Sequence, residues 1–154
     1  MTIYVIRHAH AGARGAWPGD DRDRPLSDKG KRQAAHLTRL LADAPITAVY
    51  SSPFRRCLET VTQLAECRGL TPQAVPELNE GGAGDRAVRF ALDHAAEHPV
   101  LCSHGDLIPK MLRRLSAGGM RSPDGNVAAK GSLWVLDVDP TSGKVLTGTY
   151  HAPG

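Results

Sequence analysis

Short apolar runs alternate with longer, half-polar segments along the whole chain. The first run, "MTIYVI", is almost free of polar residues, as expected for a strand that is covered on both faces of a sheet. Similar runs predict further strands at 46–52, 71–75 and 99–103. The segments between them carry apolar residues at helical spacing and predict helices over 28–44, 53–69, 85–97 and 104–119.

Residues that start and stop helices stand at the edges of these segments. Ser27 is placed to cap the first helix, and Pro45 ends it. Pro53 is expected in the first turn of the second helix and Gly69 just past its end, the usual asymmetry of these two residues. The chain closes with two β-rich segments around "PTSG", which predict a hairpin over 131–151.

Strands that alternate with helices are typical of α/β proteins with a mostly parallel sheet. The terminal hairpin would add antiparallel edge strands, so we expect a three-layer αβα sandwich. A chain of 154 residues should bury roughly 68–70% of the surface that its unfolded form exposes. It contains no repeat or linker, and we expect residues 1–154 to form a single domain.

Composition narrows the class of protein. Hydrophobic residues at 41% and charged residues at 23% are ordinary for a globular chain. No apolar run approaches the roughly 20 residues that cross a bilayer, and no signal peptide opens the chain, so we expect a cytoplasmic protein without membrane contact. Three cysteines without C-x-x-C spacing indicate small, mostly buried hydrophobes. The net charge of +3 favours anionic partners, whereas 5% aromatic residues disfavour nucleic acid.

Polar residues follow three of the predicted strands. Arg7 and His8 come after the first, a pair of serines at 51–52 ends the second, and His104 follows the fourth. In parallel α/β sheets the ligand crevice lies at the carboxyl ends of the strands. A lone histidine at a strand end is more often structural than catalytic, but here several polar residues should meet at one edge.

The helix after the second strand adds features of an anion site. Ser52, Arg56 and Thr60 are spaced four apart and share one helical face, while Arg55 points about 100° away from Arg56. Backbone N–H groups at a helix start and a guanidinium beside them make a phosphate site. The segment "SHGD" around His104 has the same character, because its glycine allows close backbone approach and a helix follows at once.

Two arginines and two histidines around one anion favour phosphoryl transfer through a histidine. A neutral imidazole can attack phosphorus when other charges neutralise the phosphoryl oxygens. Arg7, Arg56 and His104 could supply these charges without a metal or another cofactor. The leaving alkoxide needs a proton, so a carboxylic acid should lie near the site mouth. Glu80, after the third strand, is the stronger candidate, and Glu77 is the alternative.

Five segments together resemble one family. "RHAHAG", "LSDKGKRQA", "SSPFRRCLET", "ELNE" and "CSHGD" are similar in order and spacing to motifs of the histidine phosphatase superfamily, also called the phosphoglycerate mutase-like family. The resemblance implies that His8 is the nucleophile and that Glu80 is the acid and base. It assigns the phosphate pocket to Arg7, Arg56 and His104. It also implies a phosphohistidine intermediate that water hydrolyses, with no metal or cofactor.

Within this family the chain is similar to two short branches, the domains fused behind Nudix hydrolases and the SixA-type phosphohistidine phosphatases. Neither has the large cap domain of phosphoglycerate mutases and acid phosphatases. The resemblance implies a phosphorylated small molecule such as a nucleotide, or a phosphohistidine protein, as partner. The family's usual Arg-His-Gly is Arg7-His8-Ala9 here, and we expect the loop to tolerate the methyl group if the φ angle of Ala9 is negative.

Other interpretations stay open. His8 and His10 could be a metal-binding H-x-H pair, but the amidohydrolase barrel that uses such a pair needs roughly 250 residues. The fold could also bind phosphate without turnover, or transfer it as a mutase does, although little chain is available for a cap. His10 is expected to pack beside its loop, with substrate contact at the pocket rim as the alternative, and Lys130 is a weaker candidate for the crevice. The segment "GDDRDR" at 19–24 is expected to be a solvated surface, with substrate recognition at the site mouth as the alternative.

Overall fold

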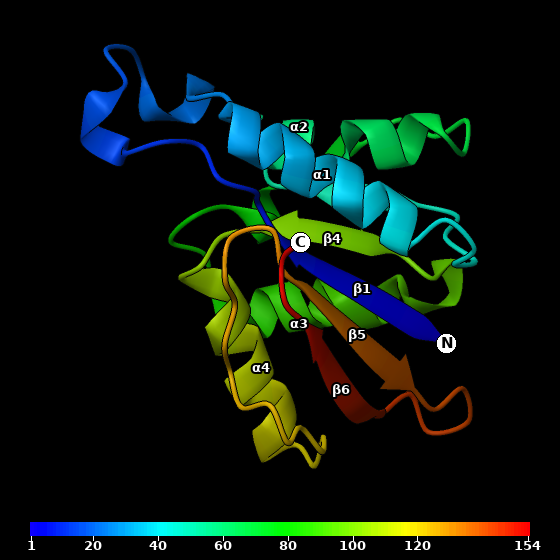
Figure 1. Cartoon of the computed structure of the whole chain (residues 1–154). Helices are drawn as coiled ribbons and strands as arrows, with labels where there is room; N and C mark the ends of the chain where they lie inside the picture. The colour runs from blue at the N-terminus through cyan, green and yellow to red at the C-terminus, as the bar shows by residue number, and fades with distance from the viewer.

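A six-stranded sheet organises the protein (Figure 1). The computed structural model describes residues 1–154. The strands are β1 (Thr2–Arg7), β2 (Val49–Ser51), β3 (Gln73–Ala74), β4 (Val100–Ser103), β5 (Leu133–Val138) and β6 (Val145–His151). They lie in the order β3-β2-β4-β1-β5-β6, in which the first four are parallel and the hairpin β5–β6 is antiparallel. The predicted mostly parallel sheet with an antiparallel edge is confirmed.

Helices cover both faces of this sheet. The α-helices are α1 (Asp28–Leu40), α2 (Arg55–Glu66), α3 (Gly84–Asp93) and α4 (Leu107–Ala117). Short 3-10 helices are η1 (Arg14–Ala16), η2 (Asp21–Asp23), η3 (Pro76–Leu78) and η4 (Ala95–Glu97). Figure 1 shows α1 and α2 on one side of the strands and α3 and α4 on the other. This is the expected three-layer αβα sandwich, and it has no large cap domain.

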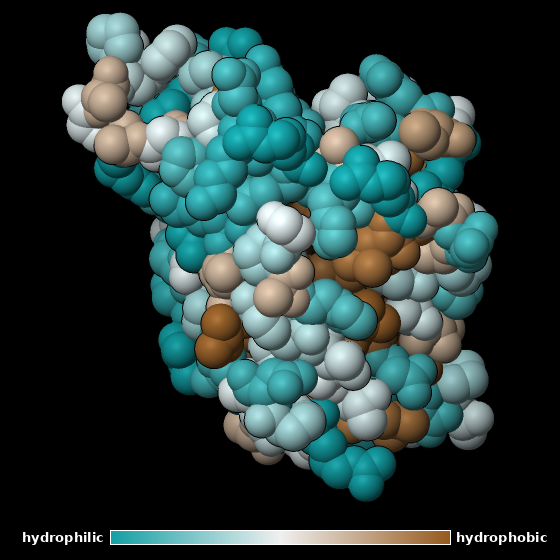
Figure 2. Space-filling view, in the orientation of Figure 1, coloured by the Kyte–Doolittle hydropathy of each residue, from teal (hydrophilic) through white to brown (hydrophobic).

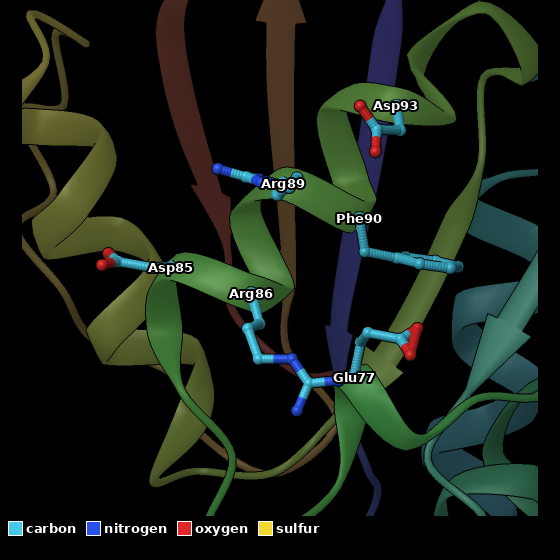
Figure 3. A pocket seen from close by; sticks show the side chains of 6 residues that line it. All are labelled: Glu77, Asp85, Arg86, Arg89, Phe90 and Asp93. Carbon is cyan, nitrogen blue, oxygen red and sulfur yellow. The ribbon is translucent and has the colours of Figure 1, made fainter.

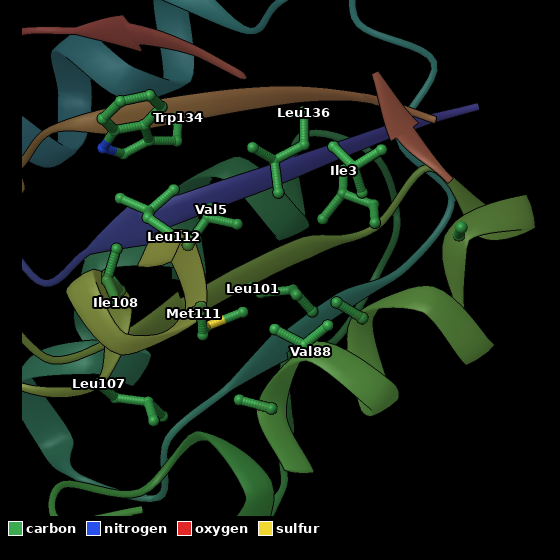
Figure 4. Packing of buried hydrophobic residues seen from close by; sticks show 14 of the residues in the cluster. Ile3, Val5, Val88, Leu101, Leu107, Ile108, Met111, Leu112, Trp134 and Leu136 are labelled. Carbon is green, nitrogen blue, oxygen red and sulfur yellow. The ribbon is translucent and has the colours of Figure 1, made fainter. Parts of the chain in front are cut away.

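Each face of the sheet has its own hydrophobic core. Because side chains alternate along a strand, Ile3 and Val5 point to the side of α3 and α4, and Tyr4 and Ile6 point to the side of α1 and α2. Figure 4 shows the first of these cores, in which α4 side chains such as Met111 pack against the strands. Burial on both faces explains why β1 is apolar throughout.

The elements occur in the predicted order, but several are shorter than expected. The helix predicted over 85–97 ends at Asp93 and continues as η4, and the left-handed φ of 48° at His98 then turns the chain into β4. Strands β2 and β3 pair over only three and two residues, since β3 is an edge strand with one neighbour. Cys67 is exposed rather than buried, because it is the C-cap of α2.

The helix-boundary residues Ser27 and Gly69 are confirmed, whereas α1 ends at Leu40, before the predicted stop at Pro45. Ser27 Oγ accepts a hydrogen bond of 3.1 Å from the Gly30 N–H and so caps α1. Gly69 follows α2 with a φ of 67°, the left-handed conformation that favours glycine. Pro53 was expected inside the first turn of α2, but it precedes the N-cap residue Phe54, where its rigid ring leads the chain out of the strand instead.

The surface is uneven in its polarity. Figure 2 shows a hydrophilic outer face over α1 and the loop before it, and hydrophobic side chains mainly in a band beside the strands. Among large apolar residues, Leu40, Val127 and Leu146 are exposed. None of the helices combines the length and the apolar character that a membrane span requires.

The central parallel strands end together at one edge of the sheet. Arg7 is paired with Ser103 across β1 and β4, and Ser51 with Cys102 across β2 and β4. Backbone pairing continues one residue further, because the His8 N–H donates to the Ser103 carbonyl at 3.0 Å. The residues that leave these strands therefore start from a rigid base.

Candidate active site

His8 lies below the surface in a single tautomer. The residue is 5% exposed, and its Nδ1 lies 2.8 Å from the carbonyl oxygen of Ala9, which can only accept. Nδ1 therefore carries the proton, and Nε2, which has no hydrogen-bond partner in the protein, keeps its lone pair. Burial lowers the pKa of His8 to about 3, and neighbouring positive charges act in the same direction. His8 is a neutral imidazole with a free nucleophilic nitrogen.

His104 faces His8 across the site. The two ring centroids are 5.5 Å apart and the planes meet at 64°. His104 Nε2 lies 2.8 Å from Ser52 Oγ and 3.6 Å from Cys57 Sγ, whereas Nδ1 has no protein partner. When the Ser52 hydroxyl donates to Nε2, Nδ1 carries a proton and can donate it to an anion beside His8.

Arg7 enters the site from the end of β1. Its Nη1 donates to the Ala128 carbonyl at 2.7 Å, and its buried Nε has no partner in the protein. The guanidinium lies directly against the backbone of Gly105, where a Cβ would be only 2.4 Å from the Arg7 Cζ. Burial lowers the pKa of Arg7, although an arginine remains charged in proteins. The side chain is thus a fixed cation with an unused donor.

Arg56 reaches the same place from the first turn of α2 and is fully buried. Its Nη1 donates to the Asp21 carbonyl oxygen at 2.9 Å, and its Nη2 donates to Glu80 Oε2 at 3.0 Å. The Arg56 Cζ lies 4.8 Å from the centre of the Phe54 ring, and the buried Nε is unpartnered. Two carboxylate-bearing segments therefore converge on one guanidinium.

A partly exposed layer of ion pairs surrounds Arg56. Arg14 Nη2 donates to Glu80 Oε1 at 2.6 Å, and Arg14 Nη1 lies 3.5 Å from Asp21 Oδ2. Asp21 also accepts from Arg24 Nε at 2.9 Å. Burial would raise the pKa of the Asp21 carboxyl, but the bond from Arg24 and the charge of Arg56 hold it below its ordinary value. We call Arg7, His8, Arg56 and His104 the floor of the site, and Arg14, Asp21 and Glu80 its rim.

The loop that carries Glu80 is tied to the end of β4. The Gly81 N–H donates to Asp106 Oδ2 at 2.7 Å, and the Ser103 hydroxyl donates to the Leu78 carbonyl at 2.7 Å. Glu77, the alternative acid, instead lines a separate hollow of about 520 Å³ between η3 and α3 (Figure 3). Figure 3 shows it beside Arg86, so the structure brings Glu80 and not Glu77 to the floor.

All five residues selected from the sequence thus meet at the predicted sheet edge. A neutral imidazole, two guanidinium groups and a second histidine lie around one position, and these are groups that can neutralise the oxygens of a phosphoryl group. The family model "Histidine phosphatase superfamily (branch 1)" matches residues 3–89, which is more than half of the chain. The chain belongs to the histidine phosphatase superfamily.

Two curated relatives that match the chain are named phosphatases. The chain is 32% identical to the 8-oxo-(d)GTP phosphatase of Mycolicibacterium smegmatis, over 99% of this chain and 48% of that protein. It is 34% identical to the adenosylcobalamin/alpha-ribazole phosphatase of Salmonella typhimurium, over 60% of this chain and 46% of that protein. The chain spans about half the length of these relatives.

Solved structures share the fold. The protein histidine phosphatase SixA in complex with tungstate superposes with a TM-score of 0.76 over 99% of this chain and 96% of that one, at 20% identity. The putative phosphohistidine phosphatase SixA of Agrobacterium tumefaciens gives a TM-score of 0.71 over 89% and 91% of the two chains, at 23% identity. The first match covers 99% of this chain and so includes the terminal hairpin, which lies beyond the residues that the family model matches.

Ala9, the departure of this histidine phosphatase from the usual Arg-His-Gly, fits its loop. Its φ is not positive, since His98 is the only non-glycine residue with a positive value. The residue is completely buried, its methyl group belongs to a small cluster with Leu26 and Ala34, and its N–H donates to Thr60 Oγ1 at 3.0 Å. The loop accommodates alanine, as expected.

His10 does not form a metal-binding pair with His8, because it contacts the start of α1 instead. Its Nδ1 lies 2.6 Å from Ser27 Oγ at the start of α1, and its N–H donates to Gln33 Oε1 at 2.9 Å. A Cβ on Gly30 would lie 1.9 Å from the His10 carbonyl oxygen, so the loop packs directly on the helix. No group of three or more histidine, cysteine, aspartate or glutamate side chains is arranged to hold a metal ion.

Sequence reasoning missed Arg14 and Asp21. The favoured expectation, a solvated surface at 19–24, does not hold for Asp21, because its carboxylate lies 3.3 Å from the Arg56 guanidinium at the site. The available signal was the mixture of acids and bases in "GDDRDR" close to the nucleophile motif. Such a mixture does not by itself show which of its charges face the site.

Proposed function

We propose that the chain, acting as one domain over residues 1–154, is a phosphatase that hydrolyses a phosphomonoester or phosphohistidine through a phosphohistidine intermediate and without a metal. The observation that carries this proposal is the state of His8, a neutral imidazole with a free Nε2 among Arg7, Arg56 and His104. A nucleophile towards phosphorus needs a lone pair and a cationic surrounding at once.

In the first step His8 Nε2 attacks the phosphorus, and the bond between phosphorus and the leaving group breaks. Arg7 and Arg56 bind the phosphoryl oxygens, and His104 Nδ1–H donates to them. The imidazole acquires positive charge when Nε2 is phosphorylated. The bond from Nδ1–H to the Ala9 carbonyl, 2.8 Å long, stabilises that charge and fixes the ring.

In the second step water attacks the phosphohistidine, and the electron pair of the N–P bond returns to Nε2. Glu80 is the base that takes the proton from this water, because its carboxylate is held beside the floor by Arg56 at 3.0 Å. With a leaving group that requires a proton, the same carboxyl would first have to donate one. Glu80 is therefore proposed as both acid and base.

Names of relatives support two classes of substrate. The Mycolicibacterium smegmatis relative is named for an oxidised guanine nucleotide, and the SixA structures are named for phosphohistidine. We propose a phosphorylated small molecule such as a nucleotide, or a phosphohistidine protein, as the partner of the site. Either partner would first meet the rim, whose ion pair between Arg14 and Glu80 is exposed to solvent.

Turnover of p-nitrophenyl phosphate by wild type and two histidine variants tests the proposal. His8→Ala should lower kcat by about 10⁴-fold or more, as removal of a nucleophile does. His10→Ala, a neighbour directed to Ser27, should retain most of the activity. Rapid quench and mass spectrometry should find one phosphoryl group on His8, and EDTA should leave the rate unchanged.

Two outcomes would contradict the mechanism. Equal activity of wild type and His8→Ala would show that His8 is not the nucleophile. Loss of activity in EDTA with recovery on addition of zinc would show a metal-dependent reaction instead.

A further inference from the structure

Lys130 lies beside the nucleophile although it is distant from it in the sequence. The N–H of the next residue, Gly131, donates to the carbonyl oxygens of both Arg7 and His8, at 3.1 Å each. Gly131 adopts a φ of 80°, and a Cβ there would lie 3.0 Å from the Gln33 side chain. This turn holds Lys130 against the backbone of the floor. Lys130 is not among the residues to which the family resemblance assigned a role.

The ammonium group of Lys130 has no partner. It forms neither an ion pair nor a hydrogen bond in the protein, although the residue is half-buried. Its charged neighbours are cations, and partial burial together with Arg7, Arg24, Arg56 and Arg14 lowers the pKa of Lys130. A half-buried cation among like charges is unfavourable in the free enzyme and becomes favourable when an anion binds.

The transferred phosphoryl group does not need this cation. Arg7, Arg56 and His104 already provide donors for its oxygens, so Lys130 is available for a further anionic group of the substrate. That group would lie on the leaving side, at the mouth of the site.

The state of Glu80 points to the same kind of leaving group. Its two oxygens accept hydrogen bonds from separate guanidinium groups, Oε1 from Arg14 at 2.6 Å and Oε2 from Arg56 at 3.0 Å. Both carboxylate oxygens are therefore occupied as acceptors in the free protein. A phosphate leaving group, with a second pKa of about 6, leaves as an anion and needs no proton from Glu80, so both of these hydrogen bonds can persist during transfer.

We propose that Lys130 binds an anionic leaving group, and that the phosphoryl group transferred to His8 is the terminal phosphate of a phosphoanhydride. This inference rests on the phosphohistidine mechanism proposed above and specifies its substrate class. The bond from His8 Nε2 to the terminal phosphorus forms while the bond from that phosphorus to the bridging oxygen breaks. The bridging oxygen keeps the electron pair. The phosphate that carries this oxygen leaves as an anion, and the Lys130 ammonium binds it. Water then releases inorganic phosphate, with Glu80 accepting the proton.

ADP, AMP and inorganic pyrophosphate are the probes for this inference. ADP and AMP share the nucleoside, but only ADP has an anhydride bond, and pyrophosphate has the anhydride without the nucleoside. Wild type should release phosphate from ADP with at least about tenfold higher kcat/KM than from AMP, as the loss of one charge-assisted hydrogen bond predicts. If pyrophosphate reacts like ADP, the anhydride alone suffices; if only ADP reacts, the nucleoside contributes as well. Either result supports the assignment.

Variants of Lys130 show whether this residue provides the preference. Lys130→Met should lower kcat/KM for ADP about ten- to hundredfold. This loss should be at least about ten times larger than the loss in kcat/KM for p-nitrophenyl phosphate. Lys130→Arg keeps the charge and should restore most of the ADP activity, which separates binding from a folding defect. Lys144→Met, at an exposed lysine near the hairpin turn, is the matched control and should behave as wild type.

Equal losses of Lys130→Met on ADP and p-nitrophenyl phosphate would overturn the role of Lys130. A wild-type preference for AMP over ADP would overturn the substrate class. Both failures leave the proposed function standing if aryl phosphate turnover still depends on His8. Absence of any His8-dependent turnover would overturn the proposed function and this inference with it.

Discussion

The floor and the rim of the site are built in opposite ways. The floor comes from residues at strand ends and from the start of α2, it is largely buried, and it keeps unpaired donors such as the Nε atoms of Arg7 and Arg56. The rim comes from loops, and its side chains are exposed by 64% at Arg14 and 26% at Glu80. Its charges neutralise one another across short distances.

Because of this difference, the floor and the rim should have separate roles, the floor in binding the anion and the rim in controlling which molecules enter. Donors that are buried and unpaired in the free protein gain a full hydrogen bond when an anion arrives, because water does not compete for them. Exposed ion pairs are worth little in comparison and can open at low cost. The floor should therefore determine how fast the phosphoryl group is transferred. The rim should determine which molecules reach the floor.

Replacing a floor cation should have the largest effect. Arg56→Met removes a buried cation and its unpaired Nε donor from the proposed phosphoryl site, and we expect kcat/KM to fall by about 10³-fold. Arg55→Met is a matched control on the adjacent position, where the exposed guanidinium pairs with Glu59 at 3.3 Å, and it should stay within about threefold of wild type. Steady-state kinetics with p-nitrophenyl phosphate measures both, and equal losses would contradict the division between floor and rim.

Moving a floor cation without removing it should have the next largest effect. Gly105→Ala places a Cβ 2.4 Å from the Arg7 Cζ, and the flexible end of that side chain must shift. We expect kcat/KM to fall about 10²-fold, because the guanidinium leaves its position while the backbone is unaffected.

Thermal unfolding shows whether the effect of Gly105→Ala is local. Gly118→Ala is the control, since its nearest neighbour would be 3.5 Å away and its φ is −84°. Both variants should melt close to wild type. A large fall in Tm for Gly105→Ala alone would mean that the glycine serves the fold rather than the site.

Burial of His8 should appear in the acid stability of the protein. The pKa of His8 is lowered to about 3 by burial, against about 6.5 in an unfolded chain. Between these values the unfolded state binds a proton that the folded state does not, so stability rises with pH and falls as the pH drops below about 6.5. The loss attributable to His8 should approach about 1.4 kcal/mol per pH unit.

Urea unfolding of wild type and His8→Gln at about pH 6.5 and about pH 4.5 measures this contribution. The wild type should lose about 2 kcal/mol more than the variant over this interval. Parallel losses in the two proteins would indicate that His8 titrates normally and is more accessible than its position implies.

The smallest effect is expected at the rim. Arg14→Met breaks the exposed pair with Glu80, in which Arg14 is 64% exposed, and should change kcat/KM by no more than about threefold to fivefold. Added salt should reduce the difference from wild type, because it screens exposed pairs. A change as large as that of Arg56→Met would show that the rim shares the work of the floor.

Periodicity and strand-end position sufficed to place the floor. Arg7 and His8 stand at the end of an apolar strand, Arg56 shares a helical face with Ser52, and His104 follows the apolar strand β4, so each could be located from its neighbours in the sequence. The fourth helix, predicted from residue 104, begins at Leu107. The limits of elements were less predictable. The helix predicted over 85–97 stops at Asp93, since helical spacing alone does not reveal where tertiary packing ends.

The sequence by itself determined the order of strands and helices, the edge at which the polar residues gather and the family to which they belong. These properties follow from local patterns, which repeat every two or 3.6 residues and survive in any packing. The fold was needed to show that Asp21 meets Arg56 and that Arg14 meets Glu80. It was also needed to show that the Ala9 carbonyl fixes the proton on His8 Nδ1 and that Lys130 lies without a partner beside them. Contacts between loops distant in the sequence leave no periodic pattern, because they depend on how the whole sheet brings its edges together.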